Sequence, residues 1–342
     1  MMQLTPAVQP SPALQAKAED SERQRWREVV ARYQKPSLRR ASWQVINTLV
    51  PYVGTWVLMV FTSKVSLLLT LPLAVLAGGL LVRTFILFHD CCHGSFFKSQ
   101  KANDVLGRIT GLLTYTPYAH WRWEHALHHA TSGNLSRRGI GDIWTMTVQE
   151  YKQSPRFKRF CYRLVRHPLI LFGIGPIFLL VFLHRAVSAQ APRRERRSVH
   201  LTNLGVTLMV AGLVWLLGWK AFLLIQLTVL WVVGSAGIWL FYVQHQFEGT
   251  YWEKDDNWDF VTAALKGSSY YRLPKILQWF SGNIGFHHIH HLSARIPNYH
   301  LERAHLAEPL FQSVHALTLR ASLASLGLRL WDEDEQKLVG FR

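Results

Sequence analysis

Cysteine is scarce in this sequence: its 342 residues include three, Cys91, Cys92 and Cys161. They form no C-x-x-C pair and no disulfide framework, which excludes a disulfide scaffold and cysteine-ligated iron–sulfur or rubredoxin-type iron. A glycine-rich dinucleotide fingerprint is also missing. Gly139 and Gly173 each begin a G-x-G that lacks the third glycine and a preceding strand. Any electrons that this chain consumes must therefore come from another protein.

Acidic residues are few as well: 21 Asp and Glu stand against 38 Lys and Arg, a formal net charge of +17. Such a charge suits nucleic acid, anionic lipid or an acidic protein partner. We place nucleic acid last and expect none to bind, because the basic residues flank apolar runs instead of forming a soluble face. No stretch before residue 42 is apolar enough for a signal-peptide core, so no cleavable signal is expected.

Long apolar runs supply much of the 49% hydrophobic content. Four of them have about the length that crosses a hydrocarbon core of ~30 Å. These four predicted spans are residues 43–62, 65–88, 201–218 and 221–244. Two-residue links, Ser63–Lys64 and Trp219–Lys220, join them in pairs, which predicts two tight hairpins. A fifth run, 168–184, is shorter, and we interpret it as re-entrant or interfacial.

The lysine and arginine distribution predicts the orientation. The segment 1–42 is rich in arginine, whereas the two hairpin tips carry one lysine each, Lys64 and Lys220. The basic cluster Arg193–Arg197 would lie outside if the run 168–184 crossed the membrane. We therefore expect the tips outside and both termini in the cytosol.

The predicted fold class is thus an all-α integral membrane protein with four transmembrane helices in two hairpins. Its domains are a basic cytosolic N-terminal segment (1–42), a membrane domain (43–310) and a cytosolic C-terminal tail (311–342). Residues 89–200 and 245–342 would form a helical cap on the cytosolic side. The stretch up to Tyr33 is expected to form a short helix, either on the membrane surface or solvated.

Eight of the 17 histidines fall into three spaced sets. The sets are His89 and His93; His125, His128 and His129; and His287, His290 and His291. Their spacings of i, i+4 and of i, i+3, i+4 place each set on one face of a helix. Two repeats of H-x-x-H-H are not expected by chance at this histidine content. The other histidines, such as His315, are interpreted as ordinary polar or surface groups.

Neutral imidazole is a good ligand for Fe, Zn, Cu or Ni. Eight imidazoles are too many for one tetrahedral zinc ion, so they suit two metals with open positions. His245, at the cytosolic end of the last predicted span, is a candidate ninth ligand, and an interfacial histidine is the alternative. Cys91 and Cys92 point away from the His89/His93 face of a regular helix and are not expected to be ligands.

Polar residues beside the histidine sets are candidates to orient the ligands, since a ligand imidazole usually donates its second ring N–H. The carboxylates Asp90, Glu124 and Asp142 could each accept such a bond, or could be ordinary surface charges. Asn283, one helical turn before His287, could orient a water or a ligand. His120 and His288 lie off the repeating pattern and are expected beside the ligands or at the surface.

The order H-x-x-x-H, H-x-x-H-H and H-x-x-H-H, interleaved with hydrophobic hairpins, resembles the histidine boxes of the membrane fatty acid desaturase family. The resemblance covers roughly residues 40–310, and the boxes are most similar to those of bacterial acyl desaturases. It implies that the eight box histidines and His245 bind two iron ions, with O2 as co-substrate, in a bacterial inner membrane. The sequence departs from many members where its third box opens with a doubled histidine, His287–His288.

The activity expected from this resemblance is desaturation, the insertion of a C=C bond into a fatty acyl chain held as a lipid, a thioester or a free acid. Removing hydrogen from an unactivated methylene needs O2 and a metal, because no side chain can do it. The expected partners are membrane lipid and an external carrier, such as a ferredoxin or a cytochrome b5-like protein, with its reductase.

Two alternatives stay open at this point. The desaturase superfamily includes decarboxylases that convert a free fatty acid into a terminal alkene, and Arg122, Arg137 and Arg138 could anchor its carboxylate or contact lipid headgroups. A membrane metal-binding or transport protein is a more distant reading. The positions of the histidine sets argue against it, because the sets flank the spans and do not lie inside them.

Overall fold

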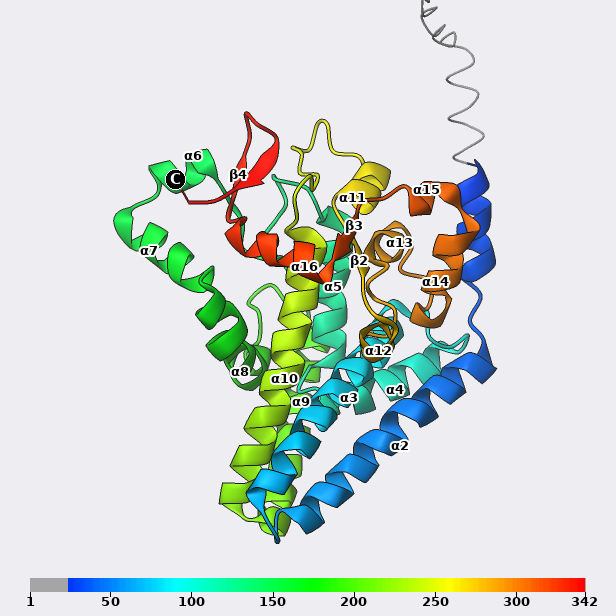
Figure 1. The fold of residues 1–342 in the computed structure, drawn as a ribbon, viewed down its shortest axis with the longest axis vertical. Helices are drawn as coiled ribbons and strands as arrows, with labels where there is room; N and C mark the ends of the chain where they lie inside the picture. Colours follow the sequence, from blue (N-terminus) through cyan, green and yellow to red (C-terminus); the bar gives the residue numbers. More distant parts are fainter. Residues whose placement is uncertain (1–23, 342) are drawn as a thin grey trace, which may run out of the picture.

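The computed structural model describes residues 24–341, so residues 1–23 of the predicted N-terminal segment, and residue 342, lie outside the described part. Within it the chain is mostly helical, and four helices are long and apolar enough to cross a membrane. They are α2 (Leu38–Thr62), α3 (Leu67–His93), α9 (Arg193–Leu217) and α10 (Trp219–His245). Figure 1 shows them as a bundle, with the shorter elements gathered at one end.

Local capping explains where α2 and α3 begin and where α3 ends. The hydroxyl of Ser37 accepts a hydrogen bond from the Arg40 amide at the start of α2. Ser66 accepts one from the Leu68 amide in the same way at the start of α3. α3 ends at His93, and the following Gly94 has a φ of 68°, the left-handed conformation that glycine adopts at least cost. The first histidine set is therefore the last turn of α3.

The four helices match the predicted spans but extend beyond them on the side of the histidines. α3 continues past residue 88 to His93, and α9 begins at Arg193, so the basic cluster Arg193–Arg197 is its first turn. The reason is that an apolar window marks only the part suited to hydrocarbon, whereas main-chain hydrogen bonding continues into the polar region. The predicted link Trp219–Lys220 is wrong, since both residues begin α10 and Gly218 alone separates α9 from α10. This link and the turn between α2 and α3, which contains Lys64, lie at the opposite end of the bundle (Figure 1).

The core of the bundle lies between α3 and α10. Leu81, Ile225 and Val229 are fully buried there. A Cβ atom added to Gly78 would lie 2.6 Å from Cβ of Val232, so the two helices approach closely because residue 78 is a glycine. Small residues allow this kind of contact between membrane helices.

The shorter helices connect and cover the ends of the bundle. They are α4 (Gln100–Leu113), α5 (Tyr118–Thr131), α6 (Val148–Gln153), α7 (Arg156–Val165), α11 (Phe260–Lys266), α12 (Lys275–Phe280), α13 (His287–Leu292), α14 (Asn298–Ala307), α15 (Pro309–Gln312) and α16 (Leu319–Ser322). A 3-10 turn, η3 (Leu323–Gly327), follows α16. The second histidine set lies on α5 and the third on α13.

The apolar run 168–184 is irregular. It forms a π-helical segment, η1 (Leu169–Ile174), then α8 (Gly175–Val181) and a 3-10 turn, η2 (Leu183–Arg185). Together with α7 it makes a pair bent by 56°. That geometry suits a broken span or a re-entrant segment, so the re-entrant interpretation stays a prediction.

Within residues 24–341, five short strands accompany the helices, and the all-α prediction did not include them. β1 (Met146–Thr147) pairs in parallel with β4 (Leu330–Asp332), and β4 pairs antiparallel with β5 (Lys337–Val339). β2 (Tyr270–Arg272) pairs in parallel with β3 (Ala316–Thr318). Each strand has two or three residues, too few to show an alternating pattern in the sequence.

The predicted C-terminal tail is part of the fold. β3 and β4 connect residues after 311 to segments that precede them by far in the sequence. Trp331 is 1% exposed, among the largest fully buried side chains of the described part. The apolar residues scattered through this region, such as Leu330 and Leu338, pack with Met146 and Trp252 from earlier segments of the chain.

Helical residues 24–33 also pack against the protein. Val30 is 7% exposed and shares an apolar cluster with Ile289 and Leu301. Its apolar face therefore covers α13 and α14, while Arg25, Arg27 and Glu28 on the same helix are exposed. The two predicted surroundings of that exposed face, lipid surface and water, stay predictions.

Candidate metal centre

The three histidine sets and His245 converge at the end of the bundle where the short helices gather. α3, α5, α10 and α13 supply the side chains, because the last turn of α3 and the last residue of α10 face α5 and α13. Seven of these nine imidazoles are buried, and those of His93 and His129 are half-buried. The helical spacing within each set thus presents every ligand candidate to one interior region.

The nine histidines divide into two groups, and the ring nitrogens within each group lie within 4.8 Å of one another. The first group is His89, His93, His125, His129 and His290. The second group is His128, His245, His287 and His291. The second and third boxes contribute to both groups, so neither group corresponds to a single box.

The Nε2 atoms point inward in both groups. In the first group, Nε2 of His125 lies 3.0 Å from that of His89, and Nε2 of His290 lies 3.0 Å from that of His129. In the second group, the Nε2 atoms of His287 and His245 are 3.0 Å apart. Side chains from different helices therefore present the same ring atom to a common point.

These residues fit a pair of metal ions. Buried ring nitrogens need partners, yet Nε2 of His93 and Nε2 of His128 have no hydrogen-bond partner within the described part of the chain. The donor set is all imidazole, which suits iron and other borderline metals and does not suit calcium or magnesium. Each group has enough nitrogens to hold one ion.

A neutral imidazole is the form that ligates a metal. For five ligand candidates on α5 and α13, burial lowers the pKa far below the ordinary value, and neighbouring histidines lower the pKa further. The five are His125, His129, His287, His290 and His291.

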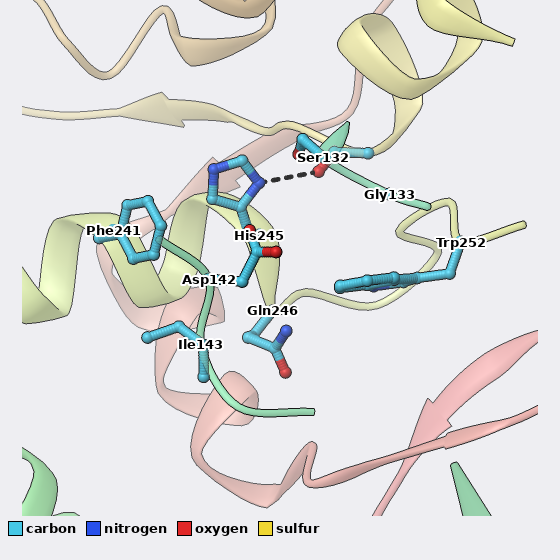
Figure 2. A pocket seen from close by; sticks show the side chains of 9 residues that line it. Ser132, Gly133, Asp142, Ile143, Phe241, His245, Gln246 and Trp252 are labelled. Atoms are coloured by element: carbon cyan, nitrogen blue, oxygen red, sulfur yellow. Dashed lines mark hydrogen bonds between the residues drawn. The ribbon is translucent and has the colours of Figure 1, made fainter. Parts of the chain in front are cut away.

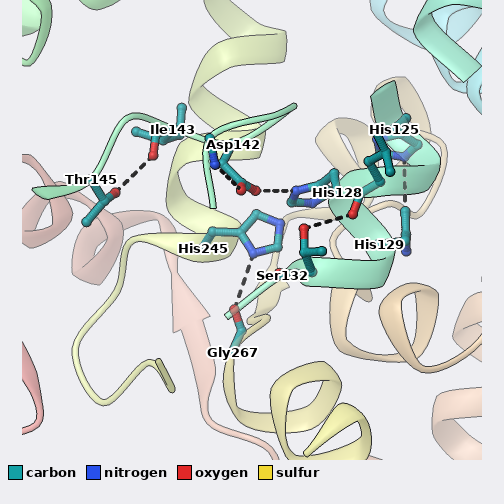
Figure 3. A network of polar contacts seen from close by, with 12 residues as sticks. His125, His128, His129, Ser132, Asp142, Ile143, Thr145, His245 and Gly267 are labelled. Atoms are coloured by element: carbon teal, nitrogen blue, oxygen red, sulfur yellow. Dashed lines mark hydrogen bonds and ion pairs between the residues drawn. The ribbon is translucent and has the colours of Figure 1, made fainter. Parts of the chain in front are cut away.

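Two of the predicted carboxylates contact ligand candidates, one in each group. Oδ1 of Asp90 lies 3.2 Å from Nδ1 of His89 in the first group. In the second group, Nδ1 of His128 donates to Oδ1 of Asp142 over 2.6 Å (Figure 3). His245 donates from Nδ1 to the main-chain oxygen of Gly267, 3.2 Å away. Such bonds hold the second ring nitrogen and leave the Nε2 lone pair free.

Glu124 and Asn283 have other partners. The Glu124 carboxylate lies 3.4 Å from Nδ1 of His120, one turn earlier on α5. Asn283 does not precede His287 on one helix, since α13 begins at His287 and Asn283 has a φ of 61° in the preceding turn. Its amide donates to the main-chain oxygen of Asn298. Neither contact reaches a ligand candidate, so Glu124 and Asn283 stabilise the surrounding fold instead.

The two adjacent histidines that open the third box, His287 and His288, have different surroundings. His287 joins the second group, while the adjacent His288 turns away and its Nε2 lies 3.1 Å from the main-chain oxygen of Phe311. Cys91 and Cys92 are buried in a separate apolar cluster with Phe88, away from the His89/His93 face as expected.

The three arginines predicted as possible headgroup anchors each have an acidic neighbour. Arg122 lies 3.6 Å from Asp104, Arg137 lies 2.9 Å from Asp255, and Arg138 contacts Glu150. Each of the three thus has a carboxylate partner, and their role as headgroup anchors stays a prediction.

A small pocket adjoins the second group (Figure 2). His245 and Asp142 line it, together with apolar side chains that include Phe241 and Trp252. The ring of Phe241 also lies 5.0 Å from that of His128, centroid to centroid. Phe241 stands one turn before His245, a helical spacing that could have marked it from the sequence. The wall beside the second group is thus partly aromatic.

Comparison with known proteins gives a consistent result. The fatty acid desaturase family profile matches residues 66–320. A "Fatty acid desaturase" of Bacillus subtilis (strain 168) is 49% identical over 313 residues, which is 92% of this chain and 89% of that protein. Two proteins of Synechocystis sp. also match. An "sn-1 oleoyl-lipid 12-desaturase" is 30% identical over 67% of this chain and 65% of its own length. An "sn-1 acyl-lipid omega-3 desaturase (ferredoxin)" is 29% identical over 66% of this chain and 64% of its own length. This chain therefore belongs to the fatty acid desaturase family.

Proposed function

We propose that this protein is an O2-dependent di-iron enzyme that inserts a C=C bond into the acyl chain of a membrane lipid. The observation that carries the proposal is the convergence of nine buried or half-buried imidazoles in two groups at one end of four apolar helices. The names of the relatives, which specify desaturation of lipid-bound acyl chains, support the same reaction and substrate class.

Each of the two histidine groups would hold one iron. Bound iron would supply the oxidation by O2 that protein side chains cannot perform. Asp90 and Asp142 keep a proton on Nδ1 of His89 and His128, so that Nε2 of each ring stays available as a ligand. The burial of the surrounding histidines excludes bulk water from the reacting methylenes. Overall, O2 would accept two hydrogens from the acyl chain, with two electrons and two protons from outside, and form two waters.

Oxidative decarboxylation to a terminal alkene has less support. The three relatives are all named for desaturation. The arginines that could have held a free carboxylate are engaged by acidic side chains.

The test of the reaction is expression in a bacterial host that lacks a desaturase, followed by gas chromatography of fatty acids and volatile hydrocarbons. We expect new monounsaturated acyl chains in the lipid fraction and no terminal alkene. Terminal alkenes without unsaturated acyl chains would contradict the assignment. A chain carrying His290→Ala is the matched inactive control.

We further propose that the four helices form two hairpins in a bacterial inner membrane, with the histidine-bearing cap in the cytosol. The basic cluster Arg193–Arg197 and the short helices lie at one end of the bundle. The two helix links lie at the other end, with Lys64 in the first link and Lys220 beside the second (Figure 1). The excess of arginine at the cap end favours the cytosol for that end.

Cysteine labelling checks this orientation. Arg196 and Lys64 are both exposed, at opposite ends of the bundle. With Cys161→Ser as background, we expect a membrane-impermeant maleimide to label Lys64→Cys in cells with a permeabilised outer membrane. Arg196→Cys should react only after the inner membrane is opened. Efficient labelling of Arg196→Cys from the periplasm would contradict both the orientation and the re-entrant interpretation of residues 168–184.

A further inference from the structure

A buried series of hydrogen bonds leads from α2 to the first histidine box. Gln44 donates from Nε2 to Oδ1 of Asn298, 2.6 Å away. Asn298 donates to Oδ2 of Asp90 twice, from its main-chain N–H over 2.7 Å and from Nδ2 over 2.8 Å. The other carboxylate oxygen of Asp90 faces His89. All four residues are buried, Asn298 completely. The series joins α2, α14 and α3, which are distant in sequence.

The chemistry of the groups gives this series a direction. A carboxylate only accepts hydrogen bonds, so Asn298 must turn its NH2 group to Asp90 and its oxygen to Gln44. Gln44 must then donate. Its Oε1 atom is left without a hydrogen-bond partner in the described part of the chain. A buried amide oxygen without a partner destabilises a fold, which points to a role for Gln44 other than stability.

The direction matters for His89. Two N–H groups of Asn298 hold one oxygen of Asp90, so the second oxygen is kept facing Nδ1 of His89 as an acceptor. His89 then carries its proton on Nδ1. Its Nε2 lone pair faces the first histidine group, 3.0 Å from Nε2 of His125.

We propose that Asn298, supported by Gln44, is a positioning residue for the metal of the first group. It sets the orientation of Asp90 and through it the tautomer of His89. The inference rests on the proposed function, because it assumes a metal in each group. The second group has its own carboxylate, Asp142 on His128. A substitution at Asn298 should therefore weaken the binding of the ion in the first group and leave the binding of the other ion unchanged.

The test is metal binding by the purified full-length chain. Asn298→Asp keeps the side-chain size but replaces the donor that faces Asp90 by an acceptor. We would strip the protein of metal and titrate it with Co2+, followed by visible absorption, and then with Fe2+. Wild type should bind two ions. The variant should bind one ion normally and the other roughly 10–100-fold more weakly, the usual effect of losing an orienting partner.

A matched control separates positioning from folding. Asn103 on α4 is equally buried, but its amide bonds to the main chain of Phe97. Asn103→Asp should lower the thermal unfolding temperature of the metal-free protein and still bind two ions. Gln44→Leu removes the amide oxygen that lacks a partner, so this variant should fold. It should weaken the binding of the same ion as Asn298→Asp does, by a smaller factor.

The outcomes distinguish this inference from the proposed function. Wild type that binds no ion would overturn the proposed function. Wild-type affinity for both ions in Asn298→Asp would overturn the positioning role alone. If Asn298→Asp does not fold, Gln44→Leu decides: selective weakening of one ion supports the role, and two ions bound as in wild type overturn it.

Discussion

Replacing His290 or His128 by alanine is expected to abolish desaturation and to lower bound iron. His290 belongs to the first histidine group and His128 to the second, so each substitution removes a nitrogen from a different ion. Loss of a residue that only orients a ligand already costs roughly 10–100-fold in affinity or activity. Loss of the ligand itself should therefore lower turnover by more than about 100-fold. Iron per chain, measured by mass spectrometry beside turnover, checks this.

Two histidines outside the groups serve as controls. His315 is exposed, and His315→Ala should change neither iron nor turnover. His288 is the sharper control because it is fully buried and adjacent to His287, yet it faces Phe311. His288→Gln, which can still donate to that carbonyl oxygen, should retain both ions. Full activity in His290→Ala or His128→Ala would remove the two-metal assignment.

The purified enzyme with O2 and substrate alone should complete at most one turnover. The sequence contains no iron–sulfur or dinucleotide motif, so two electrons per double bond must come from a carrier. An acidic ferredoxin-like protein with its reductase should restore cycling, in line with the ferredoxin named for one Synechocystis relative. Product per enzyme, measured with and without the carrier, checks the prediction.

Salt should slow this electron transfer steeply. The chain has a net charge of +17, and attraction between opposite charges weakens as the Debye length falls from ~10 Å at 0.1 M to ~3 Å at 1 M salt. Turnover at limiting carrier should fall with ionic strength, whereas binding of the apolar acyl chain should not weaken. Multiple turnovers without any reductant would contradict the proposed reaction, because O2 is reduced to two waters only with two added electrons per double bond. Turnover indifferent to salt would remove the role assigned to the charge.

Much of the fold was predictable because its signals are local. The four apolar runs predicted four long helices, and the spacing within each histidine set predicted a common face. His245 was found by its place at the end of the last span, and the structure brings it into the second group. The short strands and the packing of residues after 311 were missed, because contacts of two or three residues leave no periodic pattern.

The candidate site was predictable in its members but not in its arrangement. The sequence predicted two metals for three boxes but not how the boxes divide between them: His125 and His129 join one group and His128 the other. Asp90, Glu124 and Asp142 were equivalent candidates, and Glu124 instead contacts His120, its i,i+4 neighbour on α5. Asn298 could not be predicted from the sequence, because nothing around a lone asparagine at the start of a short helix indicates that it contacts Asp90.

The sequence by itself determined the apolar spans and the three histidine sets, because hydrophobic length and helical periodicity are properties of neighbouring residues. The resemblance of the histidine boxes pointed to the desaturase family, which the comparisons confirm. Only the tertiary structure decided which histidines share a group and which carboxylate faces which ring. His290 meets His129 across 161 positions, and Asp90 meets Asn298 across 208. Contacts at such separations depend on how whole helices pack, and no local pattern specifies that packing.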